Sequence, residues 1–220
     1  MELFKSAAAI IAAYCLGSIS GAYVVGRLVK GIDMTTVGNG RIGASFSIQK
    51  LGLGWGLVVG VWDFLKGAAA IGLAFALSLS VADFVLVGLA AVAGHNWSIF
   101  LGFKGGRGAA ASFGVLSSLA LIPSLVTVAA VLPVFLATRR ARSWIGIRRS
   151  TLMFGVSMLV VTIVIWAFLT SGILPLSLWP QKTSLLLAVL PLGLLIMNIT
   201  KRPWHPAVDE FFSGIRAGRR

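Results

Sequence analysis

The sequence predicts an all-α, polytopic integral membrane protein with seven transmembrane helices, two of them short. Three observations support this fold class: 58% of the 220 residues are hydrophobic, only 11% are charged, and the mean hydropathy is +0.96. This composition excludes a water-soluble domain of the same length. Because the spans use most of the chain, we expect one transmembrane domain over residues 1–220, with its chemistry in short loops or between helices.

The charge balance also indicates a membrane protein. Nineteen lysines and arginines oppose six acidic residues, which gives a formal net charge of +13. Such a basic chain binds either nucleic acid or a membrane surface, and the apolar content favours the lipid bilayer as partner over nucleic acid. The single cysteine, Cys15, lies in an apolar run, which excludes an intramolecular disulfide and a cysteine-based zinc site.

Five apolar runs are long enough to cross a hydrocarbon layer, which takes roughly 20 helical residues. They cover residues 3–26, 53–79, 83–101, 151–171 and 183–199. The stretch 108–138 is too long for one span and short for two, and Pro123 divides it. We interpret it as two short helices, because proline begins a helix more readily than it continues one. A cleavable signal peptide is a less favoured interpretation of the first run.

The basic residues predict the topology. Most of them fall in four segments, which are residues 27–50, 104–107, 139–149 and 201–220. If residues 108–138 cross the membrane twice, all four segments lie on one side, whereas a single crossing would divide them. The positive-inside rule therefore favours seven crossings of the cell membrane, or a re-entrant pair at residues 108–138, with the N-terminus outside and the C-terminus in the cytoplasm.

Two predicted cytoplasmic loops combine glycines with cations. Glycines allow backbone N–H groups to surround an anion, lysine and arginine supply charge, and the first turn of a helix after Gly108 adds unpaired N–H groups. The candidate phosphate ligands in these loops are Gly38, Asn39, Gly40, Arg41, Gly43, Ser45, Gly105, Gly106, Arg107 and Gly108, with Lys104 beside them. The alternative is that the glycines make tight turns and the cations set topology and contact anionic lipids.

Three polar residues in the predicted spans are further candidates. Asp63 and Lys66 are one helical turn apart in the second span, where isolated charges are costly. They form either an intrahelical ion pair or part of a site, in which Lys66 would bind phosphate. His95, in the third span, is a candidate general base or phosphate ligand, with a hydrogen-bonded structural histidine as the alternative.

Four short motifs occur in a fixed order over residues 14–115. They are Gly17-Ser18-Ile19-Ser20-Gly21-Ala22-Tyr23 with Arg27, Gly38-x-Gly40-x-Ile42-Gly43-Ala44, Asp63-x-x-Lys66-Gly67, and Gly94-His95 running to Phe103-Lys104-Gly105-Gly106-Arg107-Gly108. Their order and spacing resemble the PlsY-type glycerol-3-phosphate acyltransferases. The resemblance implies a seven-helix bacterial inner-membrane enzyme of phospholipid biosynthesis. It would transfer a fatty acyl group from acyl phosphate to glycerol 3-phosphate, giving lysophosphatidic acid, without acyl-CoA, metal or other cofactor.

For this reaction we expect His95 and Lys104 to be the catalytic residues. The first motif departs from the family pattern, with Arg41 in the place of an asparagine, and the C-terminal motif His-x-x-Asn-Ile-x-Arg is not recognisable in the tail after Lys201. An alternative is therefore a non-catalytic paralogue that binds lipid-phosphate precursors or regulates an active acyltransferase. An anion transporter is less favoured, because the cations cluster at one face.

Overall fold

The computed structural model describes residues 1–37 and 42–119, together with residues 121, 124–126, 128–129, 160, 190, 193–194 and 196. Within these residues every regular element is a helix, which confirms the all-helical prediction. The division at Pro123, the basic tail and nearly all of the spans predicted at 151–171 and 183–199 lie outside the described residues. Seven crossings therefore remain a prediction.

The first predicted span is broken into two helices. Helix α1 covers Glu2–Ser18 and helix α2 covers Gly21–Lys30. The hydroxyl of Ser20 accepts a hydrogen bond from the backbone N–H of Tyr23 at 3.3 Å, which makes Ser20 the N-cap of α2. The apolar run at 3–26 is thus not one continuous helix, although the whole segment Glu2–Lys30 is long and apolar enough to cross a membrane.

The remaining described elements follow in chain order. They are α3 (Ala44–Leu51), α4 (Leu53–Ala76), α5 (Val81–Asn96), the 3₁₀ turn η1 (Ile99–Leu101) and α6 (Ala109–Leu119). Helix α4 and the segment Val81–Leu101 are the two other candidate membrane spans, close to the predicted runs 53–79 and 83–101. The short helix α3 was not among the predicted elements.

Close helix packing builds the core. Helix α1 packs against α5, and α4 packs against α6. A side chain added at Gly17 would overlap the carbonyl of Ala91, and one added at Gly67 would overlap that of Ala111. Glycines at these positions therefore let the backbones of neighbouring helices approach one another closely.

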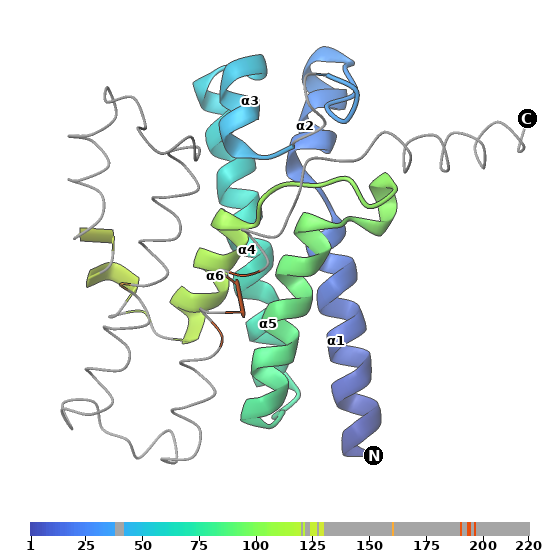
Figure 1. Ribbon diagram of the computed structural model, residues 1–220, viewed down its shortest axis with the longest axis vertical. Helices are drawn as coiled ribbons and strands as arrows, with labels where there is room; N and C mark the ends of the chain where they lie inside the picture. Colours follow the sequence, from blue (N-terminus) through green and yellow to red (C-terminus); the bar gives the residue numbers. More distant parts are fainter. Residues whose placement is uncertain are drawn as a thin grey trace, which may run out of the picture.

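The described helices have two different ends (Figure 1). Helices α2 and α3 and the loop at residues 97–108 gather at one end, which we call the loop end. The N-terminus and the turn between α4 and α5 lie at the opposite end. The basic segment 104–107 and the described residues of the segment 27–50 thus share one end, as the topology prediction requires of these two.

Candidate active site

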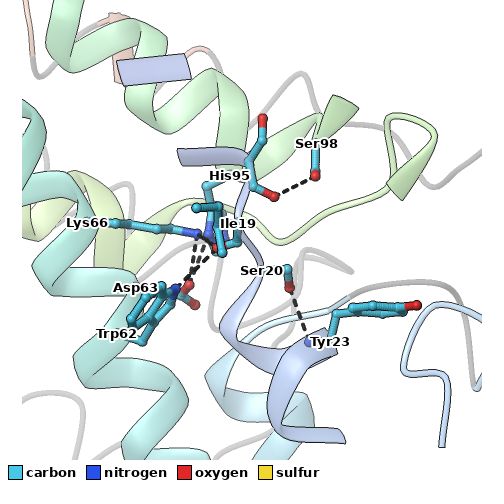
Figure 2. Close-up of polar contacts among 9 residues, drawn as sticks. Ile19, Ser20, Tyr23, Trp62, Asp63, Lys66, His95 and Ser98 are labelled. Carbon is cyan, nitrogen blue, oxygen red and sulfur yellow. Dashed lines mark hydrogen bonds and ion pairs between the residues drawn. The ribbon is translucent and has the colours of Figure 1, made fainter. Parts of the chain in front are cut away.

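Helix α4 contributes a buried ion pair. Asp63 and Lys66 are only 2% and 3% exposed, and Lys66 Nζ lies 3.0 Å from Asp63 Oδ1. The intrahelical pair expected from their spacing is therefore present (Figure 2). Lys66 also contacts the connection between α1 and α2, because its Nζ donates a hydrogen bond to the carbonyl of Ile19 at 3.2 Å.

That carbonyl marks the break between α1 and α2. Trp62 Nε1 donates a second hydrogen bond to it, also at 3.2 Å (Figure 2). Near the end of a helix the carbonyls lose their partners in the next turn, so they need other donors. Two side chains from α4, Trp62 and Lys66, supply these donors at Ile19 and tie the break to α4.

His95 brings the last turn of α5 to the same carboxylate. Its Nδ1 lies 3.4 Å from Asp63 Oδ1, and the residue is 8% exposed. The carboxylate of Asp63 thus lies between the ammonium of Lys66 and the imidazole of His95. Sequence reasoning singled out all three residues but did not bring His95 and Asp63 together.

The second glycine-rich loop rests on His95. The backbone N–H of Gly106 donates to the carbonyl of His95 at 3.0 Å. A Cβ at Gly106 would overlap Nε2 of the His95 ring and would lie 2.6 Å from the carbonyl oxygen of Ile42. Only glycine fits between these groups. Because Ile42 lies in the first glycine-rich segment, the structure brings the two predicted loops together here.

Long-range hydrogen bonds attach this loop to α1. Ser98 Oγ donates to the carbonyl of Ser18 at 2.6 Å (Figure 2), and the hydroxyl of Tyr14 donates to the carbonyl of Trp97 at 2.7 Å. The loop then leads to Gly108, whose φ of +76° favours glycine, and helix α6 begins directly after it. The predicted position of Gly108 before a helix is therefore correct.

The other predicted site residues lie around this loop or outside the described residues. Lys104 and Arg107 are partly exposed, whereas Gly105, Gly106 and Gly108 are buried. Gly43 precedes α3 and Ser45 is exposed in its first turn, while residues 38–41 lie outside the described residues.

In the described part of the chain, no group of three or more histidine, cysteine or acidic side chains is placed to hold a metal ion.

The model of the glycerol-3-phosphate acyltransferase family matches residues 7–201. One relative, glycerol-3-phosphate acyltransferase 4 of Dehalococcoides mccartyi, is 41% identical over 152 residues, which are 69% of this chain and 80% of the relative. A second, from Shouchella clausii, is 41% identical over 120 residues, which are 54% of this chain and 58% of the relative. Several such matches thus span only about half of the relative's length.

A solved structure is similar as well. The glycerol 3-phosphate form of PlsY, an integral membrane glycerol 3-phosphate acyltransferase, matches with a TM-score of 0.65 and 27% sequence identity. The match covers 89% of this chain and 90% of the solved chain. Its lysophosphatidic acid form gives a TM-score of 0.64.

The family match extends to residue 201 and so includes Asn198-Ile199-Thr200-Lys201. In sequence these four residues are similar to the Asn-Ile-x-Arg half of the C-terminal motif, with Lys201 in the place of arginine and Leu195 in the place of histidine. The predicted family and acyltransferase activity are confirmed, and the chain belongs to the glycerol-3-phosphate acyltransferase family.

Proposed function

We propose that this chain transfers a fatty acyl group from acyl phosphate to glycerol 3-phosphate at the cytoplasmic face of the cell membrane. The contact between Gly106 and Ile42 is the observation that supports this most directly, because it joins two segments rich in glycine and cations. Both substrates carry a phosphate and the donor carries a long chain. A cationic glycine-rich site among apolar helices suits both requirements.

In the proposed reaction, the 1-hydroxyl of glycerol 3-phosphate attacks the acyl carbonyl carbon. The new ester bond forms, the bond from that carbon to the phosphate oxygen breaks, and the leaving phosphate takes the hydroxyl proton. The products are lysophosphatidic acid and inorganic phosphate. Lys104 and Arg107 would hold phosphate oxygens, so positioning and charge stabilisation supply most of the rate.

We assign the remaining candidates either to the second glycine-rich loop and its neighbour His95 or to the first glycine-rich segment. Lys104 and His95 are the proposed catalytic residues, since His95 borders the loop that holds Lys104. The first segment would bind the second phosphate through Gly38, Asn39, Gly40, Arg41, Gly43 and Ser45. Arg41 would add a cation where the family pattern has an asparagine.

The proposal is tested with purified protein in lipid. Acyl phosphate and glycerol 3-phosphate, without acyl-CoA or divalent metal, should yield lysophosphatidic acid. Inactivity together with retained binding of glycerol 3-phosphate would favour the non-catalytic paralogue, in keeping with Leu195 at the histidine position of the C-terminal motif.

We also propose the full seven-helix topology, with the loop end in the cytoplasm. In a Cys15→Ala background, cysteines placed singly by Gly52→Cys, Gly102→Cys, Ser143→Cys and Ser213→Cys should react from the cytoplasmic side. Those placed by Ser80→Cys and Ser177→Cys should react from outside. Labelling of the variants at 102 and 143 from opposite faces would contradict a double crossing of residues 108–138.

A further inference from the structure

The buried pair of Asp63 and Lys66 is an expensive way to stabilise a membrane helix. Removing two charges from water costs more than their attraction returns unless further hydrogen bonds compensate, and apolar residues of similar size often give equal stability. Charged residues inside a span commonly serve function. The pair is therefore better explained by what it contacts than by its own energy.

Its contacts join α4 to two other parts of the fold. Lys66 reaches the break between α1 and α2 through the carbonyl of Ile19, and Asp63 reaches the last turn of α5 through Nδ1 of His95. Lys66 balances the charge of Asp63 at 3.0 Å. Because Lys66 already supplies a positive charge beside the carboxylate, the imidazole of His95 can lie next to Asp63 in its neutral form.

This arrangement indicates which ring nitrogen of His95 carries the proton and which one faces the glycine-rich loop. An ionised carboxylate only accepts hydrogen bonds, so across the 3.4 Å that separates the two atoms His95 can donate to Asp63 only with the proton on Nδ1. In the neutral ring Nε2 is then the acceptor. A Cβ at Gly106 would overlap Nε2, so this nitrogen faces the glycine loop.

We propose that Asp63 and Lys66 are positioning residues of the acyl transfer, which keep His95 in the tautomer that presents Nε2 as an acceptor to the loop at residues 104–108. The inference rests on the proposed function, in which that loop holds the phosphate groups. Asp63 contacts His95, so it acts through the histidine, while Lys66 pairs with Asp63 and donates to the carbonyl of Ile19 at the helix break.

The tautomer can be observed directly, because the chain has only two histidines, His95 and His205. We would record ¹⁵N spectra of histidine-labelled His205→Gln protein in lipid, where His95 gives the only imidazole signals. We expect a neutral ring protonated at Nδ1. The double variant Asp63→Leu/Lys66→Met, which removes both charges together, should fold yet show a mixture of tautomers.

Kinetics separate positioning from stability. The double variant should lower kcat by about 10- to 100-fold, because a small misplacement of a group at the reacting site can cost about 100-fold. If Asp63 acts through His95, then Asp63→Asn should reduce kcat much less in a His95→Gln background than in the wild type. Additive effects would indicate that Asp63 has only a structural role, and would overturn the proposal.

Two matched controls complete the test. Glu2→Leu/Lys5→Met removes a pair with the same spacing and the same 3.0 Å separation, but exposed to solvent, and should change neither the spectrum nor kcat. Ile71→Ala destabilises the buried face of α4 and should leave the His95 tautomer intact. Wild-type spectra and kcat in the Asp63→Leu/Lys66→Met variant would refute the inference. An inactive wild type with His95 protonated at Nδ1 would instead count against the proposed function and support the link between Asp63 and His95.

Discussion

Polar contacts at the two ends of the described helices join residues at very different distances along the chain. At the loop end, Ser98 bonds to Ser18 and Tyr14 bonds to Trp97, pairs that are 80 and 83 residues apart. At the opposite end the shortest side-chain hydrogen bonds of the described residues are local. There the side chains of Ser80 and Asp83 form a capping box, and Lys5 pairs with Glu2, all three residues apart.

Local and long-range hydrogen bonds differ in how much of the fold they need in order to form. A local bond forms whenever its own helix forms, so it tolerates changes elsewhere. A long-range bond needs several elements in place at once. The loop end should therefore be sensitive to substitution, and the opposite end should tolerate it.

The largest contrast is expected between two glycines. Gly106→Ala should reduce kcat/KM at least about 100-fold, because the added Cβ overlaps His95 and crowds the carbonyl of Ile42, and small displacements at a reacting site cost about that much. Gly72→Ala, at an open position on α4, should leave activity unchanged and stabilise the helix by roughly 0.5–1 kcal/mol. Steady-state kinetics and thermal unfolding measure both variants. Full activity of Gly106→Ala would show that the loop is not held as described.

The second contrast concerns cations. Lys104→Gln, Arg107→Gln and Arg41→Gln should each cost roughly 1.5–3 kcal/mol, or about 10- to 150-fold in kcat/KM, if these side chains hold phosphate oxygens. Lys104→Arg should also be harmful, because a planar guanidinium does not replace a point charge in a tight loop.

Arg139→Gln and Arg149→Gln are the matched controls, since their expected role is topology alone. Both should be mild in the same kinetic assay. If the loop variants prove equally mild with unchanged substrate affinity, the phosphate site is wrongly assigned and the basic loops only set topology.

The features that the sequence predicted are those set by composition and short spacing. The apolar run from residue 53 predicted α4, which covers Leu53–Ala76, and the separation of Asp63 and Lys66 predicted their ion pair. Both depend on residues within one helix. The family was likewise recognised from short motifs, each within a few neighbouring residues.

The features that it did not predict depend on contacts between helices. The run 3–26 is apolar enough on average to be predicted as one span, so hydropathy gave no sign of the break at Ile19, whose carbonyl accepts from two side chains of α4. The serine and glycine cluster with Ser20 as a potential N-cap was the available local signal. The approach of His95 to Asp63 had no local signal, because the two residues lie on different helices.

A smaller contrast is expected between two serines. Ser98→Ala removes the donor to the buried carbonyl of Ser18, which should cost roughly 1–3 kcal/mol and also lower kcat, since this bond anchors the loop to α1. Ser80→Ala removes only a helix cap, at about 1 kcal/mol, and should leave kcat unchanged. Thermal unfolding in lipid and initial rates would test the pair. Equal kcat in both variants would contradict the expectation that activity is more sensitive to substitution at the loop end than at the opposite end.

The smallest effect is expected at Asp33, which lies at the loop end but makes local bonds. Burial raises the pKa of this carboxyl, but hydrogen bonds from Thr35 and the nearby charge and hydrogen bond of Arg27 outweigh burial, so the pKa falls below its ordinary value of 3.8.

A lowered pKa means that the ionised carboxylate stabilises the fold above pH 3.8, and that this contribution is lost as the pH falls through the folded pKa. Because the side chain is 25% exposed, the contribution should be below about 1 kcal/mol. Asp33→Asn should therefore lower Tm slightly at pH 7, the difference from wild type should shrink well below pH 3.8, and kcat at pH 7 should stay close to wild type. A large loss of activity at pH 7 would mean that any substitution at the loop end impairs activity, whether the bonds it removes are local or join residues far apart in the sequence.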